Sequence, residues 1–215
     1  SLTADEIYTK HNYNLARLSR YDSICATYQE IIAAGKVPLI IDCGANSGLA
    51  SRYFAKEFPN AKIIGIEPDQ SNVDIARENC KQFENVAIKQ AAIGAKAGFA
   101  NIQNQAASAN AIRVELSDQP TGIAITTIDD IIRQLAIDDS ENTHVLFMVK
   151  VDIEGFEDDL FSSNLGWIAD LPLLSIELHD WMLPNEGKSR NFLRAVSEYD
   201  RDFVYIEDNV YSIKN

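Results

Sequence analysis

The stretch LIIDCGANSG, residues 39–48, decides the fold of this 215-residue chain. Its apolar first half is typical of a strand that is buried on both faces of a parallel sheet. The glycines that follow indicate a sharp turn, and residues 49–58 then have the spacing of apolar side chains that predicts a helix. A strand, a glycine turn and a helix in this order are the first unit of an α/β fold.

The alternation continues toward the C-terminus, with strands predicted at 62–67, 85–92, 144–153 and 172–178 and helices at 69–83, 127–135 and after Gly155. Residues 203–206 and 210–213 flank a turn and predict a hairpin, so the final strand should be antiparallel. Residues 94–125 are less regular, with short strands predicted at 98–102 and 122–126, and are interpreted as an inserted flap. Residues 1–37 are predicted to form an N-terminal helical cap. We therefore expect one domain over 1–215, with an α/β core at 38–215.

Composition narrows the partners and the location. A formal net charge of −13 argues against nucleic acid as a partner, because the field of the protein repels phosphates. Apolar runs are too short to cross a bilayer, so no membrane partner is expected. Three widely spaced cysteines and a start without secretory character predict a cytoplasmic protein. The oligomeric state stays open.

The turn after the first strand is predicted to be the floor of a cofactor site. Its DxGxxxG pattern is formed by Asp42, Gly44, Ala45, Asn46 and Gly48. A dinucleotide-binding fingerprint would have a second glycine where Asn46 stands, whereas the carboxylate of Asp42 matches the methionyl ammonium of S-adenosylmethionine. A glycine turn is also common in any α/β protein, so the motif alone leaves a purely structural role open.

A second carboxylate follows the next strand, where Glu67 and Pro68 end the run IIGIEP. Glu67 lies 19 residues beyond Gly48, a spacing at which a carboxylate accepts hydrogen bonds from ribose hydroxyls and rejects a 2′-phosphate. The sequence therefore predicts an adenosine-containing ligand. The alternative is a charge that only stabilises the N-terminus of the next helix.

Two later strands end in polar groups at the same predicted edge of the sheet. Lys150 and Asp152 should point the same way along a regular strand, and the next strand ends at His179, which can exchange a proton near neutral pH. Structural roles stay open for all three, since Lys150 and Asp152 can simply pair. Glu157 is interpreted as a first-turn partner of a helix dipole. Trp181 is predicted to wall the acceptor pocket by stacking.

With these segments in order, the chain resembles the FkbM family of class I methyltransferases from about Pro38 onward. The most specific matches are KVDIEGFE at 150–157, TIDD at 127–130 and ELH at 177–179. The resemblance implies a Rossmann-like, mostly parallel seven-stranded sheet with helices on both faces and S-adenosylmethionine as the methyl donor. It also implies a hydroxyl acceptor on a sugar, a glycan or a small metabolite. By the family pattern, the cofactor site is lined by Asp42, Gly44, Asn46, Gly48 and Glu67, with adenine beside Gln90, Ala91 and Ala92.

The predicted reaction is O-methylation. Alignment of the acceptor with the methyl group should contribute most to the rate, and a base should contribute ~10²- to 10⁴-fold. His179 is the first choice for that base and Asp152, which also borders the predicted cofactor site, the second. The acceptor pocket is expected among the segment after His179, the flap and the N-terminal helices.

Three alternative functions are compatible with part of this sequence pattern. An NAD-dependent or nucleotide-sugar oxidoreductase would share the sheet and Glu67, but Asn46 argues against it. A catalytically silent nucleoside-binding domain would bind cofactor without turnover. A metal-assisted reaction would use the oxygen ligands of Asp152, Glu154, Glu177 and Asp180. Only some of these can face the crevice together, so no metal is expected.

Overall fold

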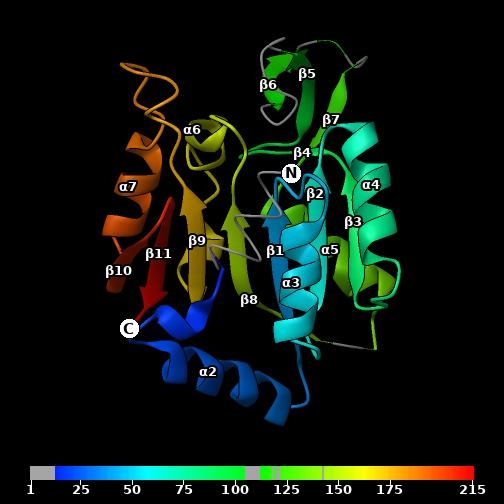
Figure 1. The fold of residues 1–215 in the computed structure, drawn as a ribbon, viewed down its shortest axis with the longest axis vertical. Coiled ribbons are helices and arrows are strands. Elements are labelled where there is room, and N and C mark those ends of the chain that lie inside the picture. Colours follow the sequence, from blue (N-terminus) through cyan, green and yellow to red (C-terminus); the bar gives the residue numbers. More distant parts are fainter. Residues whose placement is uncertain (1–12, 105–111, 118, 120–121, 142) are drawn as a thin grey trace.

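The computed structural model describes residues 13–104, 112–117, 119, 122–141 and 143–215, and its main feature is a seven-stranded sheet. The strand order is β10-β11-β9-β8-β1-β2-β3 (Figure 1). Only β11 runs against its neighbours, pairing antiparallel with both β9 and β10. The expected mostly parallel sheet with an antiparallel last strand is therefore confirmed. The strands are β1 (Val37–Cys43), β2 (Lys62–Glu67), β3 (Val86–Gln90), β8 (His144–Val151), β9 (Leu173–Glu177), β10 (Arg201–Ile206) and β11 (Asn209–Lys214).

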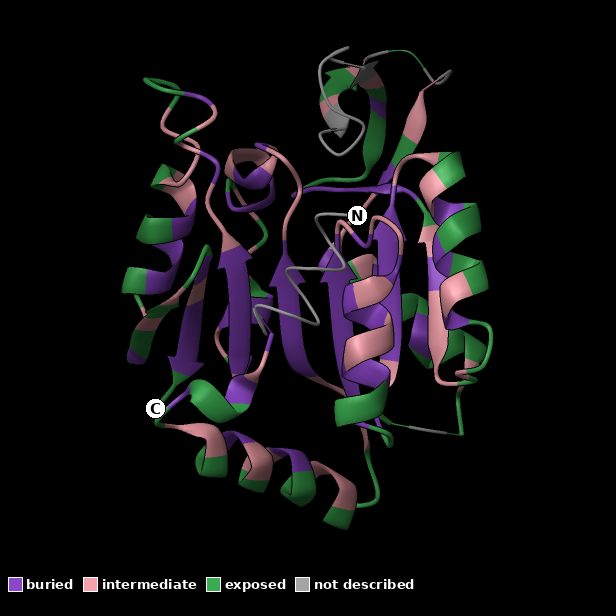
Figure 2. Cartoon of the chain, viewed as in Figure 1, coloured by how far each residue is buried: buried purple, intermediate pink, exposed green. Residues whose placement is uncertain are grey.

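Helices cover both faces of this sheet, because successive residues of its central strands point to opposite sides. In β1, Ile41 packs toward α5 and α7, whereas Ile40 packs toward α2 and α3. Both are fully buried, and Figure 2 shows the central strands as an almost continuous buried layer. The helices are α2 (Tyr21–Ala33), α3 (Leu49–Glu57), α4 (Gln70–Cys80), α5 (Ile128–Asp138), α6 (Glu157–Leu160) and α7 (Arg190–Ser197), with short 3-10 turns η1 (Leu15–Arg17) and η2 (Gly166–Ile168).

Side-chain caps fix where two of the predicted helices begin. Asp69 accepts a hydrogen bond from the backbone N–H of Asn72 at the start of α4, and Thr127 accepts one from Asp130 at the start of α5, both at 3.0 Å. Such caps satisfy N–H groups that have no partner inside the helix. The predicted helices at 49–58, 69–83 and 127–135 are confirmed to within a few residues. Helix α7 lies in a segment for which no helix was predicted.

The predicted flap forms a second, four-stranded sheet in the order β4-β7-β5-β6, made of β4 (Ala92–Ile93), β5 (Gly98–Asn104), β6 (Ile112–Ser117) and β7 (Ile123–Thr126). Figure 1 shows it beyond the carboxyl ends of the parallel strands. The predicted strand at 85–92 is wrong at its end, because the chain leaves the main sheet at Ala91 and Ala92 pairs with Ile125 instead. Strand β6 was not predicted. Flap residues 105–111, 118 and 120–121 lie outside the described residues.

The described N-terminal segment divides between the two ends of the sheet. Helix α2 lies at the end opposite the flap (Figure 1), where the Tyr28 hydroxyl accepts a hydrogen bond from the backbone N–H of Asn60 ahead of β2. It does not border the carboxyl ends of the strands. Tyr13 is buried against Phe54 of α3. Residues 1–12, the first part of the predicted cap, lie outside the described residues. Among the described helices, none has the length and apolar character needed to span a membrane.

Candidate active site

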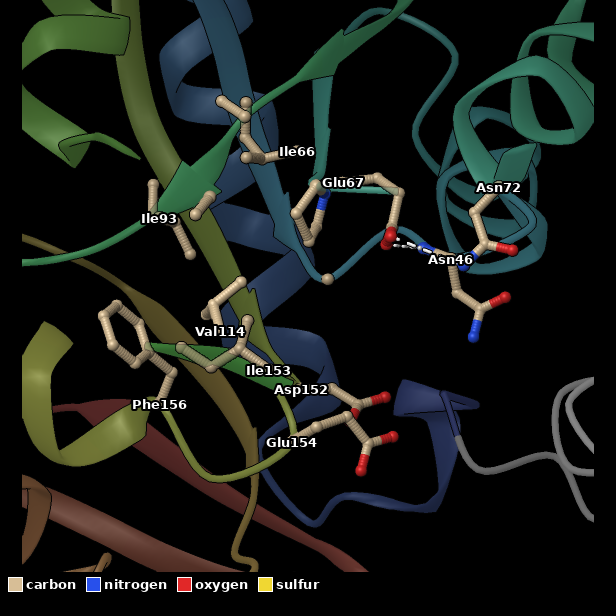
Figure 3. A pocket seen from close by; sticks show the side chains of 14 residues that line it. Asn46, Ile66, Glu67, Asn72, Ile93, Val114, Asp152, Ile153, Glu154 and Phe156 are labelled. Carbon is tan, nitrogen blue, oxygen red and sulfur yellow. Dashed lines mark hydrogen bonds between the residues drawn. The ribbon is translucent and has the colours of Figure 1, made fainter. Parts of the chain in front are cut away.

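A crevice of about 530 Å³, measured out to its open mouth, lies at the carboxyl ends of β1, β2 and β8. This is where α/β sheets bind ligands. Seven residues predicted for the site line it, namely Gly44, Asn46, Glu67, Pro68, Ala91, Ala92 and Asp152. The flap contributes Val114 of β6. Figure 3 shows the polar side chains of Asp152 and Glu154 at one side of the crevice and Glu67 with Asn46 at another.

The glycine turn allows two backbone segments to touch. At Gly44, with φ of 80°, a Cβ would lie 1.8 Å from the carbonyl oxygen of Asp152. At Gly48, with φ of 77°, a Cβ would lie 2.9 Å from both the Cα and the Cβ of Ala76 in α4. Any side chain would separate these elements, and the left-handed conformation itself favours glycine. The DxGxxxG pattern thus fixes the floor of the crevice by close packing.

Glu67 joins the glycine turn to the start of α4. Its Oε2 accepts a hydrogen bond from the backbone N–H of Asn46 at 2.8 Å (Figure 3), and its Oε1 accepts one from the backbone N–H of Asp69 at 3.0 Å. The residue is 4% exposed, and burial raises the pKa of the carboxyl group. Both readings of the sequence apply, because Glu67 holds the loop before a helix and also lines the crevice. Its carboxylate oxygens have lone pairs left for ligand hydroxyls.

Asp42 has a different environment from the one predicted for it. The residue is fully buried, accepts a hydrogen bond from the Ser51 hydroxyl at 2.6 Å, and pairs with the Lys150 ammonium at 3.2 Å. Lys150 also donates to the carbonyl oxygen of Gly44 at 2.9 Å. Burial lowers the pKa of Lys150, but Asp42 and its other neighbours raise it well above the ordinary value. Asp42 therefore neutralises a buried lysine that supports the turn, and it does not line the crevice.

His179, which is 2% exposed, lies at the centre of a cluster of carboxylates. Its Nε2 is 3.7 Å from Asp152 Oδ1, from Glu154 Oε2 and from Glu177 Oε1. Its Nδ1 is 2.8 Å from Glu157 Oε1. Residues from β8, β9 and the start of α6 therefore meet at one point, as the sequence predicted for Asp152 and His179.

The position of Glu157 differs from the one interpreted from the sequence, in which this residue is only a partner of a helix dipole. It does begin α6, but its side chain is 1% exposed and holds the His179 ring. The same Oε1 accepts hydrogen bonds from the backbone N–H groups of Ile153 and Gly155, both at 3.3 Å. Glu157 thus orients the imidazole and closes the loop that carries Glu154. The sequence signal for this role is the second glutamate of the EGxE string, which is Glu157.

Burial and, after it, the crowding of like charges shift the pKa values of this cluster. Burial, followed by the charge of Asp152, raises the pKa of Glu154 to about 7 and that of Glu177 to about 7. Burial lowers the pKa of His179, but the hydrogen bond to Glu157 and the surrounding carboxylates raise it to about 9. Perturbed groups beside a crevice are typical of functional sites.

The remaining predicted residues lie outside the crevice lining. Ala45 and Gly48 are packed in the turn behind it, and Gln90 is exposed and donates to the carbonyl oxygen of Pro68 at 3.3 Å. Trp181 is 73% exposed on the loop after His179. Sequence reasoning missed the apolar walls formed by Ile66, Ile93, Ile153 and Phe156, and also Asn72. Ile93 directly follows the predicted segment at 90–92, and Phe156 lies within the KVDIEGFE string. Apolar side chains in such places carry no signal that separates the wall of a ligand site from the core.

The fold and the crevice together define an α/β protein of the Rossmann-like class with a ligand site at the carboxyl edge of its sheet. A model of the FkbM methyltransferase domain matches residues 42–211, most of the chain. The chain belongs to the FkbM methyltransferase family. The family and the class I methyltransferase fold expected from the sequence are thereby confirmed.

Individual relatives match shorter segments. Methyltransferase sdnD of Sordaria araneosa is 33% identical over 92 residues, which are 43% of this chain and 27% of that protein. A ribosomal RNA small subunit methyltransferase H of Corynebacterium diphtheriae is 37% identical over 54 residues, 25% of this chain and 16% of that protein. The matched segments thus span less than a third of either relative.

Similar solved structures include a putative O-methyltransferase from Klebsiella pneumoniae, with a TM-score of 0.48 and 10% identity over 90% of this chain and 80% of that one. Another is a precorrin-6y C5,15-methyltransferase from Geobacter metallireducens, with a TM-score of 0.47 and 11% identity over 92% of this chain and 90% of that one.

Proposed function

We propose that this protein transfers a methyl group from S-adenosylmethionine to a hydroxyl of a sugar, a glycan or a small metabolite. The observation that carries the proposal is the placement of Glu67 in the crevice of an FkbM-family chain. Its carboxylate is held by the N–H groups of Asn46 and Asp69 and lines the crevice, where the two hydroxyls of a ribose would find acceptors.

The crevice also has the composition that a nucleoside requires. Ile66, Ile93 and Phe156 supply apolar surface beside Glu67, and Ala91 and Ala92 leave room next to the end of β3. Ligand pockets of this kind combine apolar walls with a few polar groups that fix orientation. We propose that the adenosine half of the donor binds between these walls and that its methyl group faces Asp152.

The acceptor proton would then leave toward the carboxylate cluster. Asp152 lines the crevice, whereas His179 lies behind it with Nε2 3.7 Å from Asp152 Oδ1. A pKa of about 9 keeps His179 cationic at neutral pH, where it cannot accept a proton. The geometry therefore favours Asp152 as the group that contacts the acceptor, with His179 positioning it, which reverses the order of preference drawn from the sequence.

Calorimetry tests the donor. We expect the purified protein to bind S-adenosylmethionine and its demethylated product, S-adenosylhomocysteine, with micromolar affinity, and to bind NAD more weakly by at least about tenfold, or roughly 1.4 kcal/mol. Tighter binding of NAD than of either sulfur nucleoside would contradict the proposal and favour an oxidoreductase. A screen of hydroxylated metabolites for methyl transfer separates an enzyme from a silent binding domain, which would bind donor without turnover.

A further inference from the structure

The His179 cluster has the geometry of a metal centre. The side chains of Asp152, Glu154 and His179 each offer one ligand atom, and these atoms all lie within 4.8 Å of one another. Atoms that bind one small divalent ion at about 2.0–2.2 Å are separated by roughly 3 to 4.4 Å, according to the angle between them. The distance of 3.7 Å from His179 Nε2 to each of its carboxylate neighbours falls inside that range.

The imidazole supplies an independent indication of a ligand. His179 is 98% buried, and among the described residues its Nε2 forms no hydrogen bond. A distance of 3.7 Å is too long for a hydrogen bond. The Nε2 atom therefore faces three carboxylate oxygens without a hydrogen bond to any of them.

The other ring nitrogen contacts a carboxylate, as it does in most metal-binding histidines. His179 Nδ1 lies 2.8 Å from the buried carboxylate of Glu157. When Nδ1 carries the proton and donates it to a carboxylate, Nε2 has a lone pair free for a cation, and the ring cannot rotate. Glu157 is itself fixed by the N–H groups of Ile153 and Gly155. The arrangement thus contains both the ligands and the support behind them.

The local charge is also unbalanced. The carboxylates of Asp152, Glu154, Glu157 and Glu177 surround His179, and Lys150 pairs with both Asp42 and Asp152. A dication would offset the repulsion among these carboxylates.

We propose that Asp152, Glu154 and His179 bind one divalent cation. Mixed carboxylate and imidazole ligands match Mn²⁺ best among common ions, because carboxylates suit Mg²⁺ and Mn²⁺ and imidazole suits transition metals. No metal was expected from the sequence because it left open whether these side chains face the crevice together. The structure brings Asp152 and Glu154 to the lining of the crevice (Figure 3), and it places His179 Nε2 3.7 Å from a carboxylate oxygen of each.

This site deepens the proposed function and rests on it for its consequence. A cation at the rim of the crevice would bind the acceptor through its hydroxyl and lower the pKa of that hydroxyl. The proton would pass to solvent water at the open side of the crevice, while the oxygen takes the methyl group and S-adenosylhomocysteine leaves. Binding of the cation itself requires neither donor nor acceptor.

Electron paramagnetic resonance tests the site directly, because free Mn²⁺ gives a six-line signal that broadens when the ion binds. The full chain is stripped with a chelator, dialysed and titrated with Mn²⁺. We expect one ion per chain in the wild type and at least about tenfold weaker binding in Glu154→Gln, which removes one ligand charge. Loss of the support in Glu157→Gln should weaken binding by ~10- to 100-fold.

Glu186→Gln is the matched control, since Glu186 is an exposed acid outside the cluster that pairs with Lys188. It should bind Mn²⁺ as the wild type does. Absence of Mn²⁺ binding by the wild type, or equal binding by Glu154→Gln, would overturn the site. If Glu157→Gln fails to fold, as judged by circular dichroism, Glu154→Gln decides, because its side chain is partly exposed.

Calorimetry with S-adenosylhomocysteine on the same samples separates the two proposals. Nucleoside binding without Mn²⁺ binding refutes the metal site alone, and Mn²⁺ binding without nucleoside binding refutes the proposed donor alone.

Discussion

The two sides of the crevice are built on opposite electrostatic principles. On the β1–β2 side, the Glu67 carboxylate is held by backbone N–H groups at 2.8 and 3.0 Å, and Asp42 is paired with Lys150 and Ser51. On the β8–β9 side, carboxylates lie near one another around His179, and the pKa values of Glu154 and Glu177 are raised to about 7. One side neutralises its charges internally, and the other keeps an excess of negative charge.

The difference separates two kinds of contribution. Charges that are satisfied within the protein hold the turn in a fixed shape, so changes on the β1–β2 side should reduce both stability and donor binding. Unbalanced charges contribute little to the stability of the fold, but they favour binding of a cation or a proton. Changes on the β8–β9 side should therefore affect chemistry more than stability.

Removal of Lys150 should have the largest effect, because this residue connects the two sides. In Lys150→Met, Asp42 would be a buried charge without its partner, which typically costs about 3–5 kcal/mol. Urea denaturation should show this loss of unfolding free energy. The double variant Lys150→Met/Asp42→Asn should recover a large part of it. Additive losses in the double variant would mean that the two residues do not depend on each other.

Gly44→Ala should have the next largest effect. The methyl group would meet the Asp152 carbonyl oxygen and would stand at a φ of 80°, so the strain should cost roughly 3 kcal/mol and displace the floor of the crevice. Denaturation and calorimetry with S-adenosylhomocysteine measure the two consequences. Gly166→Ala is the matched control, because no atom lies within 4 Å of its added Cβ and its φ is not positive. Equal effects of both substitutions would refute the close-packing argument.

Glu67→Ala should weaken donor binding by roughly 1 to 3 kcal/mol, because the ribose hydroxyls lose a charged acceptor. Calorimetry measures this change. Glu67→Gln keeps the shape and one acceptor oxygen, so it should lose less affinity than Glu67→Ala does. A dissociation constant that is unchanged in both variants would place the ribose elsewhere.

Trp181→Ala should have the smallest effect on the fold, within about 0.5 kcal/mol, because the ring is 73% exposed. Donor affinity should also be nearly unchanged. If Trp181 contacts the acceptor, kcat/KM for the acceptor should fall by roughly tenfold, or about 1.4 kcal/mol. Unchanged kcat/KM would remove Trp181 from the acceptor site.

The parts of the fold that depend on local patterns could be predicted from the sequence. Apolar runs located the central strands, and the pattern around Gly44 located the turn, because close backbone approach leaves few alternatives to glycine. The separation of β3 and β4 at Ala91 could not be predicted, since residues 85–92 have one continuous strand pattern and only pairing with Ile125 divides them. Strand β6 likewise depends on its pairing with β5.

The sequence predicted those features of the site that follow from strand ends meeting at one edge of the sheet. Asp152 and His179 meet as predicted, because neighbouring parallel strands place their carboxyl ends together. The direction of individual side chains could not be predicted. Asp42 and Glu157 are buried by partners that are distant in sequence, Lys150 and His179, and a single carboxylate in a motif does not indicate which way it points.

The pairing of β4 with β7 has a consequence for how this protein can change. Ala92 lies opposite Ile125 and Ile93 opposite Thr126, so the flap leaves the core and returns to it at one place. Residues 94–124 therefore form a segment whose two ends are adjacent in the fold. Its length and surface can be exchanged without stretching the main sheet. Exchange of residues 94–124 for the corresponding segment of another family member should therefore leave the main sheet unchanged.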